Sequence, residues 1–322
     1  MSEHAIPDGA VAAATPLWRR LLVYGVFTAF AVWCLLAFRK DISQINLTPL
    51  REGWPLVLAA GGLSLFNYAL RVVRWQLYLR RLGHVLPWGF VSLTFMSGFA
   101  FTLSPGKLGE MVRGRYYQAH GITMASVTGA FFIERLLDLV VMILLAVVVL
   151  AELQAYQQFL WVAVALVGGL LVSVAVVPWT VVAERSGRSD AAGWLKVAAP
   201  VARMLASARM FLSPGLLLTG TLLGLAAWGA EAVGLKLIAD IVSPDQLSIP
   251  AAMGAYAIAI IVGALSFLPG GLGSTEVVMA ALLHAHGFDA PQAILITLIC
   301  RLLTLWLAVL IGWVCVALLR RR

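Results

Sequence analysis

Apolar residues gather into eight long runs along the 322-residue chain, separated by short polar stretches. The runs cover residues 18–38, 55–80, 87–105, 126–152, 159–182, 211–239, 250–268 and 291–319. About 20 apolar residues in a helix cross the hydrocarbon core of a bilayer. The pattern therefore predicts an all-α polytopic membrane protein.

Two of these runs end in nearly the same short sequence motif, which interrupts the helix pattern. The breaks read Pro105-Gly106-Lys107-Leu108-Gly109-Glu110 and Pro269-Gly270-Gly271-Leu272-Gly273-Ser274-Thr275-Glu276. A short helix is predicted after each break, over 107–120 and 274–287. An arginine, Arg135 or Arg301, follows each glutamate by 25 residues. The duplication predicts two repeats, over about 17–153 and about 159–320.

The two breaks indicate a polar site inside the protein. Proline removes a backbone donor and glycine is a poor helix former. Lipid cannot satisfy the freed backbone groups, so such segments are buried in protein or line a wet cavity. The N-terminus of each following short helix offers partial positive charge to a phosphate or carboxylate. The alternative, an ordinary proline kink, is disfavoured by the duplication. The break residues are Pro105, Gly106, Gly109, Pro269, Gly270, Gly271 and Gly273.

The distribution of Lys and Arg separates two topologies, because cytoplasmic loops carry an excess of both. If all eight runs cross with the N-terminus inside, 7 basic residues lie inside and 11 outside. If the two broken runs are re-entrant hairpins, 15 lie inside and 3 outside. We therefore expect six full spans plus two hairpins, with both termini cytoplasmic and the repeats inverted. Eight full spans is the alternative.

Several charges are predicted at membrane depth, where they are costly and usually functional. Arg135 and Arg301 lie nine and ten residues into their runs. They are expected to bind a head-group phosphate or to form structural ion pairs with Glu110 and Glu276, and both roles can hold together. The expected charge partners elsewhere are Glu134, Asp138 and Glu231.

Three further cations complete the predicted substrate site. Arg71 and Arg74 lie three residues apart on the second run and either capture an anionic head group or extend their side chains to the interface. Lys107 belongs to the first break and is expected at the cytoplasmic mouth.

Composition narrows the class of protein. The chain is 61% hydrophobic and 12% charged, with a net charge of +8 that gathers at segment ends and suits an anionic membrane surface. We expect no nucleic acid or nucleotide partner, no cofactor, no metal and no catalytic residue, since no motif for any of them is present.

Residues 1–16 are expected to be a disordered cytoplasmic tail, and 17–322 a single transmembrane domain. Residues 184–210 are expected to form a basic amphipathic helix on the inner leaflet.

Four motifs resemble one membrane protein family. They are Arg71-Val-Val-Arg74-Trp75, the break from Ser104 to Glu110, Glu134-Arg-Leu-Leu-Asp138, and the break from Leu268 to Glu276. The chain resembles the flippase-like family of the transmembrane region of lysylphosphatidylglycerol synthase, from about residue 20 onward. The synthase carries a soluble aminoacyl-transferring domain after this region, whereas this sequence stops at Arg322. The resemblance therefore implies lipid flipping and no enzyme activity.

The function expected from residues and resemblance together is a lipid translocase of the bacterial inner membrane. It would move an anionic or polyprenyl-type lipid between leaflets, through a midplane site at the two breaks. The alternative is a non-transporting membrane partner of a separately encoded lipid- or envelope-modifying enzyme. An intramembrane enzyme acting on lipid phosphates is the least favoured reading.

Overall fold

The computed structural model describes residues 47–150, 157–186 and 193–321. The predicted first span (18–38) and the N-terminal tail (1–16) lie outside these residues. Within them, every regular element is a helix, as the apolar pattern predicts.

The helices follow one another in this order, with short 3₁₀ segments and one π-helical segment labelled η. The first half holds α3 (Thr48–Glu52), α4 (Trp54–Arg81), α5 (Trp88–Ser97), η1 (Gly98–Phe101), η2 (Pro105–Val112), α6 (Arg113–Gln118) and α7 (Met124–Leu150). The second half holds α8 (Gln157–Val176), α9 (Trp179–Ser186), α10 (Gly193–Ala208), η4 (Arg209–Phe211), α11 (Pro214–Val242), α12 (Ile249–Leu265), η5 (Pro269–Gly271), α13 (Ser274–Ala285), α14 (Ala290–Arg301), η6 (Leu302–Trp306) and α15 (Leu307–Arg320).

Among the described residues, three helices are long and apolar enough to cross a membrane, namely α4, α11 and the continuous helix α14–η6–α15. The end of α8 and α9 make a fourth if this pair, bent by 75°, counts as one span. Helix α7 has 27 residues, which is also enough length, but it carries three charged residues in its middle. Those charges belong to the site described below.

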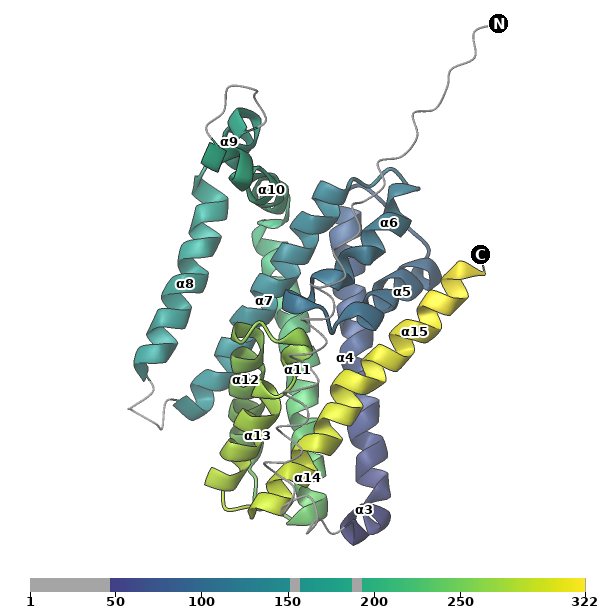
Figure 1. The fold of residues 1–322 in the computed structure, drawn as a ribbon, viewed down its shortest axis with the longest axis vertical. Helices are drawn as coiled ribbons and strands as arrows, with labels where there is room; N and C mark the ends of the chain where they lie inside the picture. The colour runs from purple at the N-terminus through teal and green to yellow at the C-terminus, as the bar shows by residue number, and fades with distance from the viewer. Residues whose placement is uncertain (1–46, 151–156, 187–192, 322) are drawn as a thin grey trace, which may run out of the picture. The chain divides into compact units, whose positions relative to one another are not determined.

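The two interrupted runs form helices that are short for a membrane. Helix α5 continues through η1 only to Phe101, and α12 has 17 residues. At 1.5 Å per residue these segments reach about 21 Å and about 26 Å, against about 30 Å of hydrocarbon. In Figure 1, α5 and α6 both lie in the upper half of the molecule, while α12 and α13 both lie in the lower half.

The short helix before the break in each half packs on a long helix of the other half. Helix α12 of the second half packs on α7 of the first, and α5 of the first half packs on α15 of the second. The long helices α4 and α11 pack on each other, and the two breaks meet where η2 contacts η5. Each broken segment is thus held by the opposite half, and both breaks lie together inside the protein.

Helix α10 differs from the sequence-based expectation. Its apolar residues Ala199, Ala202 and Leu205 are buried, and the helix packs on α7. A Cβ placed on Gly129 of α7 would meet the α10 backbone at 2.8 Å, so the contact is close. Most of the described apolar face therefore covers α7 rather than a lipid surface, although Val201 is 52% exposed.

A glycine in α15 allows that helix to touch the first broken segment. A Cβ on Gly312 would overlap the backbone of Ala100 and lie 2.7 Å from the carbonyl carbon of Phe99. We expect Gly312→Ala to lower the melting temperature in detergent, because two backbones must separate and the core tolerates no such shift. The matched control is Gly62→Ala in α4, where a Cβ meets nothing within 4 Å. Equal melting temperatures for the two variants would contradict this packing.

Candidate functional site: a buried charge cluster beside a central cavity

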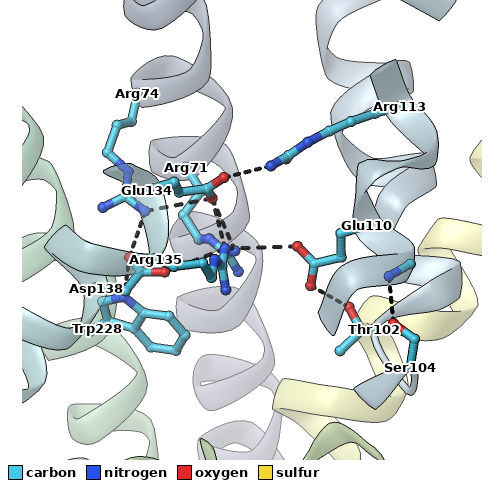
Figure 2. Close-up of polar contacts among 11 residues, drawn as sticks. Arg71, Arg74, Thr102, Ser104, Glu110, Arg113, Glu134, Arg135, Asp138 and Trp228 are labelled. Atoms are coloured by element: carbon cyan, nitrogen blue, oxygen red, sulfur yellow. Dashed lines mark hydrogen bonds and ion pairs between the residues drawn. The ribbon is translucent and has the colours of Figure 1, made fainter. Parts of the chain in front are cut away.

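Charged side chains from three helices meet inside the protein. Helix α7 carries Glu134 and Asp138 four residues apart, so both lie on one face. Arg71 and Arg74 share a face of α4 because they are three residues apart. Both arginines and Glu134 are buried, and Figure 2 shows the two arginines directed at the α7 carboxylates.

Glu134 is the centre of this cluster. Its Oε1 accepts hydrogen bonds from Arg71 Nη2 at 3.2 Å and from Arg135 Nη2 at 3.0 Å. Its Oε2 accepts one from Arg113 Nη2 at 2.7 Å. Arg74 Nη2 lies 3.6 Å from Oε1. One carboxylate therefore holds four guanidinium groups together.

Asp138 forms the second anchor of the cluster. Its Oδ1 accepts hydrogen bonds from Arg74 Nη2 at 2.6 Å and from Trp228 Nε1 of α11 at 3.0 Å, as Figure 2 shows. Arg135 Nη2 lies 3.4 Å from Oδ2. The ion pairs therefore join α4 to α7, and Trp228 extends the network to α11.

The cluster carries more positive than negative charge. Four arginines face three carboxylates, if Glu110 of the first break is counted with the two of α7. Buried charges are tolerated only when paired and hydrogen-bonded, because removing them from water is costly. The surplus of one positive charge makes this region of the protein attractive to an anion.

The first break holds Glu110 beside the cluster. Glu110 Oε1 accepts a hydrogen bond from Thr102 Oγ1 at 2.8 Å, and its Oε2 lies 3.8 Å from Arg135 Nη2. The backbone N–H of Gly109 donates to Ser104 Oγ at 2.6 Å, which ties the turn together (Figure 2). Lys107, in the same turn, has φ of 57°, a backbone conformation that side-chain-bearing residues seldom adopt.

The second break holds a tighter pair. Arg301 Nε donates to Glu276 Oε1 at 2.6 Å, and Arg301 Nη2 donates to the carbonyl of Gly270 at 2.8 Å. Arg301 thus fixes both the acid and the backbone of its own break. The acid and the arginine spaced 25 residues apart are in contact in both halves, closely in the second and loosely in the first.

The second predicted short helix (274–287) agrees with α13, whereas the first (107–120) begins as a 3₁₀ helix, and neither start is open as expected. Glu276 Oε2 accepts the backbone N–H of Gly273 at 2.6 Å, so the start of α13 is capped by a carboxylate of its own helix. In the first half the chain runs as a 3₁₀ helix from Pro105 to Val112, and α-helix begins only at Arg113. The expected pair of open α-helix N-termini facing a ligand is therefore wrong.

Two further expectations change with the structure. Arg71 and Arg74 do not extend to the interface, because both are buried and paired with α7. Sequence reasoning also missed Arg113, which is 0% exposed and lies over the Trp75 ring, 3.7 Å from its centroid. The sequence does contain a sign of such a residue. Glu134 and Asp138 outnumber Arg135 on α7, so two buried carboxylates require further cations from other helices.

A small cavity of about 50 Å³ lies beside the cluster and between the breaks. Its polar lining comes from both halves and includes Asn67, Tyr68, Arg71, Lys107, Glu110, Glu231 and Arg301. The predicted site residues Arg135 and Glu276 do not line it but contact Glu110 and Arg301, which do. Arg74 also lies outside the lining and is linked to it through Glu134, which contacts Arg71. A volume near 50 Å³ holds one or two water molecules, at about 30 Å³ each. The space seen here is therefore too small for a lipid head group.

One wall of the cavity contains an irregular helix turn. Residues Leu302–Trp306 form a π-helical segment directly after Arg301. The Tyr68 hydroxyl of α4 contacts two carbonyls of this segment, those of Leu303 at 3.3 Å and Thr304 at 2.8 Å. Such π-turns often occur at functional sites. This turn places a bendable point of the long helix at the cavity.

Apolar helices around a charged centre define a polytopic membrane protein with a buried polar site. The chain belongs to the family of the lysylphosphatidylglycerol synthase TM region, whose sequence profile matches residues 18–312. No curated protein matches the chain at a significant level. Membership of this family indicates a lipid-related membrane protein. It does not identify the lipid or the activity.

A conservative substitution tests how much the hydrogen bond from Trp228 to Asp138 contributes to stability. We expect Trp228→Phe to lower the free energy of unfolding by about 1.5–3 kcal/mol, the usual worth of a hydrogen bond to a charged group. Thermal melting of the purified protein measures the loss. The control is Trp161→Phe in α8, where the side chain is 68% exposed. Equal stability of both variants would show that Asp138 does not depend on α11.

Proposed function

We propose that this protein is a lipid translocase that moves a phosphate-bearing lipid between the leaflets of a bacterial inner membrane. One observation carries the proposal. A small cavity lined by charged residues of both halves lies at the meeting point of two helix breaks in an apolar helical protein. Membrane transporters place their substrate sites at such broken helices. The family's relation to a lipid-synthesising protein supports lipid as the substrate.

The proposed topology is six full spans and two re-entrant hairpins, with the halves inverted relative to each other. The shortness of α5–η1 and α12 supports the hairpins. The reciprocal packing of α12 on α7 and of α5 on α15 supports the inverted relation. In Figure 1 the ends of α15 and α6, with α9 and α10, lie at the upper end, and α3 lies at the lower end. We assign the upper end to the cytoplasm, because Arg115, Arg185 and Arg320 lie in the last turns of α6, α9 and α15.

Lys107 is the proposed contact for the lipid phosphate. It lines the cavity, and no carboxylate of the described residues lies within 4 Å of its amine. Every arginine of the cavity wall is already paired, Arg71 with Glu134 and Arg301 with Glu276. A phosphate would therefore meet Lys107 first, with Arg71 and Arg135 adding to the local positive potential.

Transport requires the cavity to open. Ligand pockets in proteins measure about 300–1,000 Å³, several times the volume seen here. The small cavity is consistent with a cycle in which each hairpin moves in turn, widening the cavity toward one leaflet and then the other. The π-helical turn after Arg301 offers the flexible point. No nucleotide-binding motif is present in the sequence, so we assign the driving force to the lipid gradient or to a coupled ion.

Reconstitution tests the function. Purified protein is placed in liposomes that contain a small fraction of head-group-labelled phosphatidylglycerol, phosphatidylethanolamine or polyprenyl phosphate, and a membrane-impermeant quencher is added outside. We expect the fraction of quenched lipid to rise from about half toward completeness for at least one phosphate lipid, since only movement from the inner leaflet exposes the remainder. Movement no faster than in protein-free liposomes for every lipid would favour a non-transporting membrane partner of a lipid-modifying enzyme.

A further inference from the structure

Glu231 of α11 is the exceptional acid of this protein. It is 2% exposed and lines the central cavity. Its hydrogen-bond donor among the described residues is Ser64 Oγ of α4, 3.1 Å from Oε2. No Lys or Arg nitrogen of those residues lies within 4 Å of it. A buried carboxylate normally requires a cation or several hydrogen-bond donors.

The other acids of the site, three of them buried and Glu276 partly exposed, all have such partners. Glu134 and Asp138 contact arginines of the cluster, Glu276 contacts Arg301, and Glu110 contacts Thr102 and Arg135. Glu110 and Glu276, the acids of the two breaks, are therefore engaged in holding the breaks. Glu231 has no such close cation, so its charge can be balanced only by a cation elsewhere in the cavity lining.

The groups that face Glu231 determine what can balance it. The charged residues of its cavity are Arg71 from α4, Lys107 and Glu110 from η2, and Arg301 from α14. The neutral titratable residues are Tyr68 from α4, Tyr256 from α12 and Cys300 from α14. All the charged ones except Lys107 have a closer partner of opposite charge. The cavity thus holds one unpaired cation and one unpaired acid, Lys107 and Glu231.

This pairing has a consequence when a phosphate enters. Before a phosphate binds, the charges of ionised Lys107 and Glu231 compensate each other through space. A lipid phosphate bound to Lys107 brings a second negative charge into the same small, water-poor volume. Like charges at close range in a low-dielectric site strongly oppose each other. Uptake of a proton by the Glu231 carboxylate restores the balance, since one negative charge and one positive charge enter together.

We propose that Glu231 is a proton-binding site that couples proton movement to lipid movement. A proton from water binds the carboxylate when the phosphate binds Lys107, and it leaves when the phosphate leaves on the other side of the membrane. The cavity charge stays constant through the cycle. Asn67 Oδ1, a buried oxygen of the same cavity with no partner among the described residues, is placed to accept a hydrogen bond from the protonated acid or from water. This inference deepens the proposed function and rests on it for the identity of the anion.

A metal ion is a poorer occupant of this position. Where the chain is described, no group of three or more His, Cys, Asp or Glu side chains is arranged to hold a metal ion. The positive residues Arg71, Arg301 and Lys107 also line the same cavity. A proton needs a single acceptor, whereas Na⁺ or a divalent cation needs several oxygen ligands.

The first test does not depend on lipid transport. Lys107→Gln removes the balancing cation, much as a bound phosphate would neutralise it. Infrared difference spectra of detergent-solubilised Lys107→Gln are expected to show a protonated carboxyl band that the wild type lacks. The band should vanish in the double variant Lys107→Gln/Glu231→Gln and persist in Lys107→Gln/Asp240→Asn, which changes a paired acid on the same helix. Absence of the band, or its survival without Glu231, would overturn the proposal even if the protein moves lipid.

The second test uses the unmodified protein. Phosphatidylglycerol is added to wild-type protein in weakly buffered detergent containing a pH indicator. We expect uptake of one proton per bound lipid, and none for Glu231→Gln. The same measurement is repeated with Na⁺ replacing K⁺. Lipid binding without proton uptake, or uptake abolished by Na⁺, would contradict proton coupling, whereas absence of lipid binding alone would count against the proposed substrate.

Discussion

Glu134→Gln is expected to prevent stable folding of the protein, or to lower its melting temperature far more than any other single change in the cluster. Glu134 contacts Arg71, Arg113 and Arg135 at 2.7–3.2 Å, and all of these groups except Arg135, whose side chain is 23% exposed, are buried. Removing one partner of a buried ion pair costs about 3–5 kcal/mol, because the remaining charge is left unpaired. Here one substitution leaves several arginines unpaired, and most membrane or soluble proteins are stable by only about 5–15 kcal/mol.

The measurement is the yield of monodisperse protein after detergent extraction, followed by thermal melting. Glu184→Gln in α9 is the matched control, since that side chain is exposed and has no salt-bridge partner in the described part of the chain. We expect the control to behave as the wild type. Normal yield and melting of Glu134→Gln would show that the four arginines do not need this carboxylate, and the account of the cluster would then be wrong.

Lys107→Gln is expected to leave the protein folded and to slow lipid movement by at least about tenfold. The amine has no acidic partner within 4 Å among the described residues, so the folded state loses no ion pair. A lipid phosphate would lose a charge-assisted hydrogen bond worth about 1.5–3 kcal/mol, and 1.4 kcal/mol corresponds to a factor of about ten in rate. The readouts are the initial rate of lipid quenching and the melting temperature of the same sample.

The control for this variant is Arg115→Gln. Arg115 lies eight residues further along the same broken segment, but its side chain is exposed on α6 rather than in the cavity. It removes an equal charge from the same region and should leave the rate unchanged. Equal slowing by both substitutions would indicate a general effect of surface potential, and it would remove Lys107 from the proposed phosphate site.

The long helices could be predicted from the sequence because the membrane fixes their length. The apolar runs 55–80, 211–239 and 291–319 agree closely with α4, α11 and α14–α15. Proline and glycine marked both breaks for a local reason, since they disrupt helices wherever they occur. The 25-residue spacing also placed Glu276 against Arg301. These features depend on local sequence, or on a repeated pattern within it.

Side-chain partners across helices could not be predicted in the same way. Whether Arg74 reaches Asp138 or the interface depends on which face of α4 meets α7, and no local signal determines that orientation. The burial of Arg113 depends on Trp75, which lies 38 residues earlier in the sequence and packs its ring against the guanidinium. The sequence does not distinguish a helix cap from a ligand contact at Glu276, because a carboxylate in the first turn of a helix suits both roles.

The position of α10 shows the same limit. A basic amphipathic sequence indicates that one face of a helix is apolar, but it does not say what covers that face. A membrane surface and a neighbouring helix satisfy the pattern equally well. Gly129 of α7 lets the backbone of α10 approach closely, and this local fit selects α7 over lipid for most of the described apolar residues.

Movement of labelled phosphatidylglycerol in liposomes is the most direct test of the central claim, that the cavity between the breaks carries lipid phosphate across the membrane. Wild type, Arg115→Gln and Lys107→Gln are reconstituted at equal density, and the initial rate of quenching is compared with that of protein-free liposomes. The account predicts equal, rapid movement for the first two and a rate at least about tenfold lower for the third. Movement as fast in Lys107→Gln as in the wild type, or no movement in any sample, would contradict it.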